Sequence, residues 1–181
     1  KVGVYLPQPG DPVLAFVYSQ IRNDDTTEDQ WATYQAYAEM FSHYYETYGR
    51  RIELIRFDAT GDISSSVAAT ADAETIANDI RPFMVLGGPN LTSAFADTLA
   101  ANGIMCVQCT PSQPSSFYEE RAPYVWDIQK YGEQNQQLVA EYLGKRLAGR
   151  PAAHAGGALA GSPRVFGYIH IEGSDASAEL E

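Results

Sequence analysis

The stretch Pro82–Ser112, PFMVLGGPNLTSAFADTLAANGIMCVQCTPS, decides how this chain folds. It begins as a short apolar strand, turns through Gly87–Thr92, and continues as an amphipathic helix that ends at Asn102-Gly103. A second apolar strand follows. This order describes one β-α-β unit whose two polar loops both follow the carboxyl ends of parallel strands. Because small ligands bind at that edge of open parallel sheets, the stretch predicts where a site lies.

The rest of the chain continues this alternation of strands and helices. The predicted strands are Val2–Leu6, Arg51–Phe57, Pro82–Leu86, Ile104–Cys109, Tyr124–Ile128 and Arg164–Ile171. The predicted helices are Val13–Ile21, Thr27–Tyr48, Ser65–Asp79, Ser93–Ala101, Tyr131–Leu147 and one that begins at Ser174, with a long loop at Pro111–Glu120. Regular alternation is typical of an α/β fold, so we expect an open parallel sheet with helices on both faces.

Two of these helices carry patterns that predict which side is buried. In the predicted helix Thr27–Tyr48, aromatic and small residues recur every three or four positions and predict a core-packing stripe: Trp31, Tyr34, Ala38, Phe41, Tyr45 and Tyr48. In the predicted helix Ser65–Asp79, we expect Val67, Ala71 and Ile76 to face the core. The chain ends in a strand followed by part of a helix, so we expect more sheet after Glu181.

Composition excludes several classes of function. The chain has 181 residues, of which 45% are apolar, as expected of a globular domain with a hydrophobic core. No run approaches the roughly 18 to 20 apolar residues that a membrane helix needs, and no signal peptide is visible. The net charge of −11 would repel phosphate backbones and anionic lipids. We therefore expect neither a nucleic-acid partner nor direct membrane insertion.

Cys106 and Cys109 are the only cysteines and form a C-x-x-C motif. A redox motif of this kind needs a helix N-terminus to lower the pKa of its thiol, whereas this one lies in an apolar strand. Residues three apart in a strand point to opposite faces, which makes a disulfide sterically poor. No other Cys or His pair completes a zinc site. The sequence therefore predicts two strand thiols.

The two loops of the opening unit carry recognition groups. Gly87 and Gly88 let the backbone approach a ligand, and Asn90 or Thr92 can cap the next helix, whose N-terminus favours a carboxylate or phosphate. A plain capped turn explains the same residues. The loop matches neither G-x-G-x-x-G nor a Walker sequence, so no nucleotide is expected. Adjacent parallel strands end at one edge, so the hydroxyls of Thr110–Pro114 should lie beside the first loop.

Signals for catalysis are weak. His43, His154 and His170 do not stand near a Ser or Cys in a nucleophile-elbow sequence. Asp58 and Asp62 follow a predicted strand, but the first strand ends in Leu6-Pro7 and supplies no acidic pair for a receiver-type site. We therefore expect no metal, no cofactor and no enzymatic activity.

Several segments in a familiar order resemble the type I periplasmic binding proteins. They include YGRRIEL at Tyr48–Leu54, PFMVLGGP at Pro82–Pro89, TPSQP at Thr110–Pro114 and APYVWDI at Ala122–Ile128. Within that family they are similar to the branched-chain amino-acid (Leu/Ile/Val-type) receptors of ABC transporters, in their actinobacterial form. The resemblance covers nearly the whole chain, and the order and spacing of the segments carry it.

The resemblance implies a receptor with two hinged lobes that bind a small polar ligand between them and deliver it to a membrane permease. Residues 1–150 would form the first lobe, 151–163 a flexible crossover and 164–181 the start of the second lobe. The implied ligand contacts are Pro89, Asn90, Thr92, Thr110 and Ser112. Such receptors are extracellular or periplasmic, and some carry a lipid anchor. The segment Val13–Thr26 is longer than in the family and either covers the cleft or packs under it.

Two other classes of function stay open at this point. One is an enzyme on the same fold class, such as a hydrolase that uses Cys109 or Asp58 at a strand end. The other is the ligand-sensing domain of a receptor or regulator, which shares this architecture.

Overall fold

The computed structural model describes residues 1–167, which separate into two compact units. The first unit consists of Lys1–Pro111 and Tyr118–Gln129, and the second of Ser112–Phe117 together with the chain from Lys130 onward. The first unit contains the whole sheet and both loops of the opening β-α-β stretch up to Pro111.

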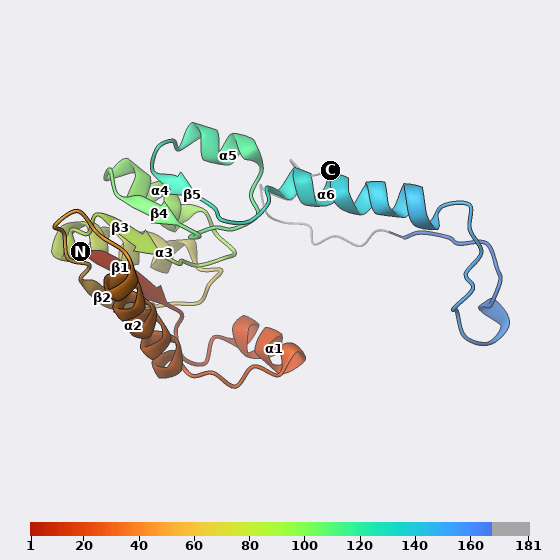
Figure 1. Ribbon diagram of the computed structural model, residues 1–181, viewed down its shortest axis with the longest axis horizontal. Coiled ribbons are helices and arrows are strands. Elements are labelled where there is room, and N and C mark those ends of the chain that lie inside the picture. Colours follow the sequence, from red (N-terminus) through yellow and green to blue (C-terminus); the bar gives the residue numbers. More distant parts are fainter. Residues whose placement is uncertain (168–181) are drawn as a thin grey trace. The chain divides into compact units, whose positions relative to one another are not determined.

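Within residues 1–167, five parallel strands form the sheet, in the order β2-β1-β3-β4-β5 (Figure 1). The strands are β1 (Val2–Leu6), β2 (Leu54–Asp58), β3 (Met84–Leu86), β4 (Met105–Val107) and β5 (Val125–Trp126). All pairings are parallel, with Val2 opposite both Leu54 and Met84. The chain moves from β1 outward to β2 and then returns to the other side of β1 for β3. This reversal creates a topological switch point between β1 and β3.

Helices cover both faces of this sheet, as the sequence predicted. The helices of the first unit are α1 (Pro12–Ile21), α2 (Thr27–Tyr44), α3 (Ser66–Thr75) and α4 (Ala94–Ala101), and α5 (Ser115–Glu120) crosses from the second unit into the first. Tyr5 contacts Phe95 of α4, with ring centroids 4.7 Å apart. Arg56, on the opposite face of the sheet, pairs with Glu28 of α2 at 2.7 Å. The strands and helices therefore confirm the predicted α/β class.

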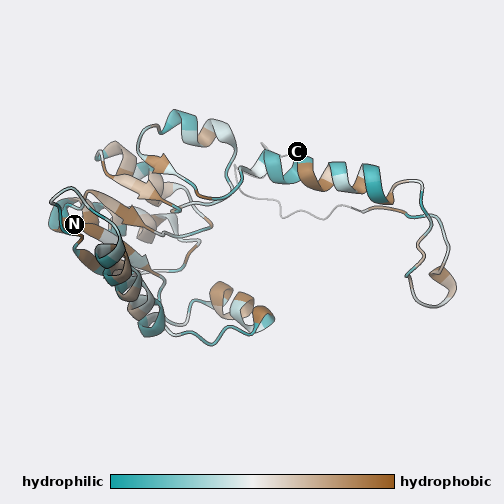
Figure 2. Cartoon of the chain, viewed as in Figure 1, coloured by the Kyte–Doolittle hydropathy of each residue, from teal (hydrophilic) through white to brown (hydrophobic). Residues whose placement is uncertain are grey.

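The hydrophobic core lies between the sheet and the α3–α4 pair. α4 buries Phe95, Ala96 and Leu99 completely, and α3 buries Ala69 and Ala73. From the sheet, Val85, Cys106 and Val125 lie on this face together with Tyr5, whereas Val4 and Leu6 are buried on the opposite face, which Arg56 shares. Figure 2 shows hydrophobic residues in the strands and in α4, and also in α1.

The aromatic stripe of α2 is not a core face, contrary to the prediction. α2 has no buried residue, and Phe41, Tyr45 and Tyr48 are exposed. The helix ends at Tyr44 rather than near Tyr48, because Tyr45 is already extended and Tyr48 has a positive φ. Periodicity identified the helix, but only its N-terminal half, through residues such as Trp31 and Tyr34, is partly covered.

Two further predictions are wrong in detail. Val67 is 81% exposed and Ala71 is also exposed, whereas Ile76 is buried as expected. The buried face of α3 instead carries Asp72, whose polar side chain masked the true periodicity. The second error is α5, a short helix that lies where a continuous loop was predicted.

The second unit is built around α6 (Gly132–Tyr142), which continues as a π-helical segment, Leu143–Leu147. This confirms the predicted helix Tyr131–Leu147. Within the predicted crossover, a short 3-10 helix, Gly157–Leu159, is closed by a bridge between Pro151 and Pro163. Residues 164–167 do not form the strand predicted from Arg164, and the rest of that strand and the helix from Ser174 lie outside the described residues. No helix in residues 1–167 has the length and apolar character needed to cross a bilayer.

Candidate functional site

A hollow of about 270 Å³ lies at the carboxyl edge of the sheet, at the switch point between β1 and β3. We call it the edge pocket. One side is the end of β1, with Leu6 and Pro7, and the other is the turn after β3, with Gly87, Gly88 and Asn90. Gln108 and Pro111 from the loop after β4 also line it. Its position is the one at which open α/β sheets bind ligands.

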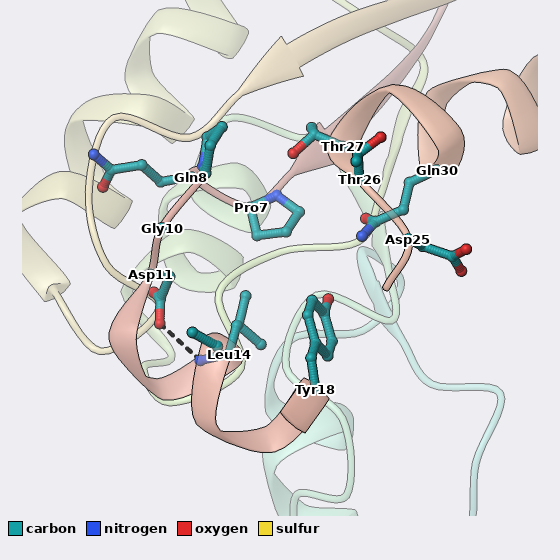
Figure 3. Close-up of a pocket in the computed structure, with 12 residues that line it drawn as sticks. Pro7, Gln8, Gly10, Asp11, Leu14, Tyr18, Asp25, Thr26, Thr27 and Gln30 are labelled. Atoms are coloured by element: carbon teal, nitrogen blue, oxygen red, sulfur yellow. Dashed lines mark hydrogen bonds between the residues drawn. The ribbon is translucent and has the colours of Figure 1, made fainter. Parts of the chain in front are cut away.

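Helices α1 and α2 complete the wall of the edge pocket. Leu14 and Tyr18 come from α1, and Gln30 and Tyr34 from α2. A second hollow of about 280 Å³ lies beside the β1–α1 turn and is lined by residues such as Gly10 and Thr26 (Figure 3). The two hollows share four lining residues, Pro7, Leu14, Tyr18 and Gln30. Residues of the long Val13–Thr26 segment therefore line both hollows, and whether the segment covers or underlies a cleft between lobes stays a prediction.

One buried carboxylate fixes the loops on this side. Asp11 is 2% exposed, and its Oδ1 accepts hydrogen bonds from the backbone N–H of Val13 at 2.9 Å and of Leu14 at 3.0 Å (Figure 3). Its Oδ2 accepts from the N–H of Ile63 at 2.8 Å. The first pair caps α1, and the third bond ties that cap to the loop after β2. Leu14 and Ile63, which both line the edge pocket, are thus positioned by one side chain.

The loops after β3 and β4 pack directly on each other. The N–H of Gly87 donates to the carbonyl of Val107 at 3.0 Å. A Cβ on Gly88 would lie only 2.8 Å from the carbonyl oxygen of Cys109, so a side chain cannot be placed there without moving backbone. The hydroxyl of Thr110 donates to the carbonyl of Thr92 at 3.3 Å. The predicted proximity of the two loops is confirmed.

The five predicted contact residues occupy different environments. Asn90 is exposed and lines the edge pocket. Pro89 and Thr110 are buried. The hydroxyl of Thr92, the residue before the N-cap Ser93, accepts a hydrogen bond from the N–H of Ala94, the first residue of α4, at 3.3 Å. Ser112 is exposed and belongs to the second unit. Asn90 alone of the five lines the edge pocket, and the binding roles of all five stay predictions.

Sequence reasoning missed most of the wall residues, including Tyr18, Tyr34 and Gln30. Their distance from the β3 and β4 loops in sequence gave no signal, because only the strand order places the end of β1 beside the end of β3. The observation that Val13–Thr26 is unusually long was the one available indication.

Cys106 and Cys109 form a disulfide, so the prediction of two strand thiols is wrong. The reason is that β4 ends at Val107 and Gln108 has a φ of 59°, so Cys109 does not continue the strand alternation. The two Cα atoms are 5.8 Å apart, and both residues are fully buried. The hydrolase alternative therefore lacks its free thiol. Its other residue, Asp58, is exposed and accepts a hydrogen bond from Arg56 at 2.9 Å.

The lining of the edge pocket, as far as residues 1–167 form it, carries no charged side chain. Its polar groups are the carboxamides of Gln30, Asn90, Gln108 and Gln129 and tyrosine hydroxyls. Burial raises the pKa of Tyr34 above its usual value, so its phenol is protonated at neutral pH, as an ordinary tyrosine also is. The same described residues contain no group of His, Cys, Asp and Glu that could hold a metal ion. This arrangement suits recognition by neutral hydrogen bonds and apolar contact.

No protein-family profile and no curated protein sequence matches this chain. Its fold is similar to solved solute-binding proteins of ABC transporters. A protein from R. palustris in complex with 4-hydroxybenzoate superposes with a TM-score of 0.55 and 17% identity. One from Rhodopseudomonas palustris BisB5 with 3,4-dihydroxybenzoic acid gives 0.52 and 18%, and one from Sphaerobacter thermophilus gives 0.52 and 16%.

Each of these matches covers 81% of this chain and 36% of the other protein, so the chain spans about a third of the length of these neighbours. At such low identity the likeness establishes the fold. The neighbours themselves are described as solute-binding or substrate-binding proteins.

Proposed function

We propose that this chain supplies the first lobe of an extracellular or periplasmic solute receptor of an ABC importer. The observation that carries the proposal is the edge pocket, which lies at the switch point of a parallel sheet and is lined by residues that follow each of the five strands. Residues 1–150 would form that lobe, 151–163 the crossover and 164–181 the beginning of the second lobe. The similar solved structures, all solute-binding proteins, support this reading of the fold.

The mechanism we propose is closure of two lobes around the ligand. The edge pocket would hold one side of the ligand, and a second lobe would cover the other. A ligand shifts the equilibrium between the open and closed forms only as far as its affinities for the two forms differ. Delivery to a membrane permease follows from recognition of the closed form. No covalent bond is made or broken.

The ligand class that fits is a small polar molecule, such as an amino acid or a related amide or carboxylate. The lining offers carboxamides, tyrosine hydroxyls and apolar walls from Pro7 and Leu14. Of the predicted contacts, Asn90 lines the pocket and would hydrogen-bond the ligand directly. Pro89, Thr92, Thr110 and Ser112 would shape or complete the two loops. Hydroxylated benzoates, which two structural neighbours hold, belong to the same range of size and polarity.

The test is calorimetry with the complete gene product. The panel contains the amino acids, small amides, short aliphatic acids and hydroxybenzoates, and we expect at least one of them to bind. Asn90→Ala should weaken that ligand about five- to tenfold, as expected for the loss of one hydrogen bond. Asn78→Ala, in an exposed helical turn that leads to the amino end of β3, is the matched control and should leave affinity unchanged. A panel without any binder would remove the main support for a solute receptor.

A further inference from the structure

We infer that Gln108 is a specificity-determining contact of the edge pocket and that it recognises an uncharged hydrogen-bonding group of the ligand. The inference rests on the proposed function and adds a residue that neither the loop motifs nor the resemblance pointed to. Gln108 follows β4 directly and lines the pocket between the loops after β3 and β4.

The first argument is the backbone of Gln108. Its φ is 59°, in the left-handed region that glycine adopts freely and other residues adopt at a cost. Among residues 1–167, four other non-glycine residues have a positive φ: Arg22, Tyr48, Arg81 and Ser112. Within that described part of the chain, Gln108 is the one that lines the edge pocket. A strained conformation at a binding cleft is the kind of outlier that marks a functional position.

The second argument is that this conformation is fixed from several directions. The N–H of Gln108 donates to the carbonyl of Trp126 at 2.8 Å, which holds it to β5. The disulfide between Cys106 and Cys109 closes a short ring that contains Gln108. Cys109 in turn packs its backbone against Gly88, where no Cβ fits. These contacts fix the backbone from which the Gln108 side chain starts, so the loop need not be ordered when a ligand binds.

The third argument is the chemistry of the lining. A carboxamide both donates and accepts hydrogen bonds, and the pocket around Gln108 has no charged side chain within the described residues. An anionic group placed here would meet no cation from this lobe. A primary amide or a hydroxyl would instead find partners in Gln108 and Asn90. Glycine would make the same turn without strain, so what the glutamine adds is its side chain.

The test pairs Gln108→Gly with Arg81→Gly in the complete gene product. Arg81 has a similar φ of 52° and ends the helical turn Ile76–Ile80, away from the edge pocket. Both variants relieve a left-handed residue, so each should raise Tm by about 2–4 °C. The affinity probes are benzamide, leucinamide, benzoate and leucine, which form two pairs of similar shape with and without a carboxylate.

We expect Gln108→Gly to weaken the amides roughly five- to hundredfold, as expected when a buried hydrogen bond is lost, and Arg81→Gly to leave them unchanged. Equal affinity of an amide for wild type and Gln108→Gly would overturn the inference. A drop in the Tm of Gln108→Gly, with the expected rise in Arg81→Gly, would also overturn it, with or without a ligand. If no probe binds wild type, the proposed function fails its own panel, and the two Tm values still decide whether Gln108 is held at a cost.

Discussion

The α3–α4 side of the sheet and the α1–α2 side are built on different principles. α3 and α4 bury small and aromatic residues against the strands, with Phe95 at 0% exposure. α1 and α2 bury no residue, and Phe16 of α1 is 66% exposed. The α3–α4 side is therefore a rigid platform, whereas the α1–α2 side supplies one wall of the edge pocket. The helices that build the core of this unit are therefore not the helices that line the edge pocket.

The largest expected effect contrasts one phenylalanine from each side. Phe95→Ala should lower the free energy of unfolding by about 3–5 kcal/mol, because it removes a fully buried ring that contacts Tyr5. Phe41→Ala removes a ring that is 44% exposed and should cost less than about 1 kcal/mol. Urea denaturation of both variants measures the contrast. Equal losses would show that the α2 stripe is covered in solution.

A second contrast concerns the contact between the two loops of the edge pocket. Gly88→Ala would place a Cβ 2.8 Å from the carbonyl oxygen of Cys109 and should cost roughly 1–3 kcal/mol. Gly144→Ala is the control, since no heavy atom lies within 4 Å of its added Cβ. It should be neutral or stabilising by about 0.5–1 kcal/mol, because Gly144 lies in a helical segment. If Gly88→Ala proves neutral in the same melts, the close packing of the loops is wrong.

The platform could be predicted from sequence because its signals are local. The apolar run before Gly87 and the one before Cys109 were enough to place β3 and β4, and Asn102-Gly103 marked the end of α4. The disulfide could not be predicted, because it depends on the left-handed turn at Gln108, and nothing in a glutamine encodes that turn.

The candidate site was only half predictable, for a topological reason. Asn90 was found because it follows β3 in a glycine-rich turn. Tyr18 and Tyr34 were not, since they join the pocket only through the strand order that places β1 beside β3. The aromatic stripe of α2 was predicted to be buried and is not, because periodicity identifies an apolar face and cannot show whether another element covers it.

The third prediction concerns alkaline pH and the polar centre of the platform. Tyr5 donates to Asp72 at 3.2 Å, and Asp72 also accepts from the hydroxyl of Thr60 at 2.6 Å. Burial, followed by the charge of Asp72, raises the pKa of Tyr5 well above its usual value of 10.0. Above that value the unfolded chain loses this proton while the native state keeps it, so stability falls as pH rises.

The expected slope from this one proton is about 1.4 kcal/mol per pH unit above pH 10. Tyr5→Phe should remove that share of the pH dependence between pH 10 and 11.5, as measured by urea denaturation at each pH. Tyr37→Phe, an exposed tyrosine of α2, controls for the loss of one phenol. If the free energy of unfolding falls equally with pH in wild type and in Tyr5→Phe, the burial of a protonated Tyr5 is contradicted.

The smallest expected effect is the difference between removing the N-cap of α2 and removing the N-cap of α3. Thr26 caps α2, accepting from the N–H of Asp29 at 3.2 Å, and Ser65 caps α3, accepting from the N–H of Ala68 at 3.3 Å. Each cap is worth about 1 kcal/mol, so either alanine variant should speed local amide exchange about fivefold. Because α3 buries Ala69 and Ala73, the loss in Ser65→Ala should also lower the Tm.

In Thr26→Ala the loss should stay local, because α2 buries no residue that would couple its ends to the core. Hydrogen exchange read segment by segment, together with the Tm of both variants, tests this difference. If Thr26→Ala lowers the Tm as much as Ser65→Ala, α2 unfolds with the sheet, and the wall of the edge pocket is as rigid as the platform. If it does not, the wall can move while the platform stays folded.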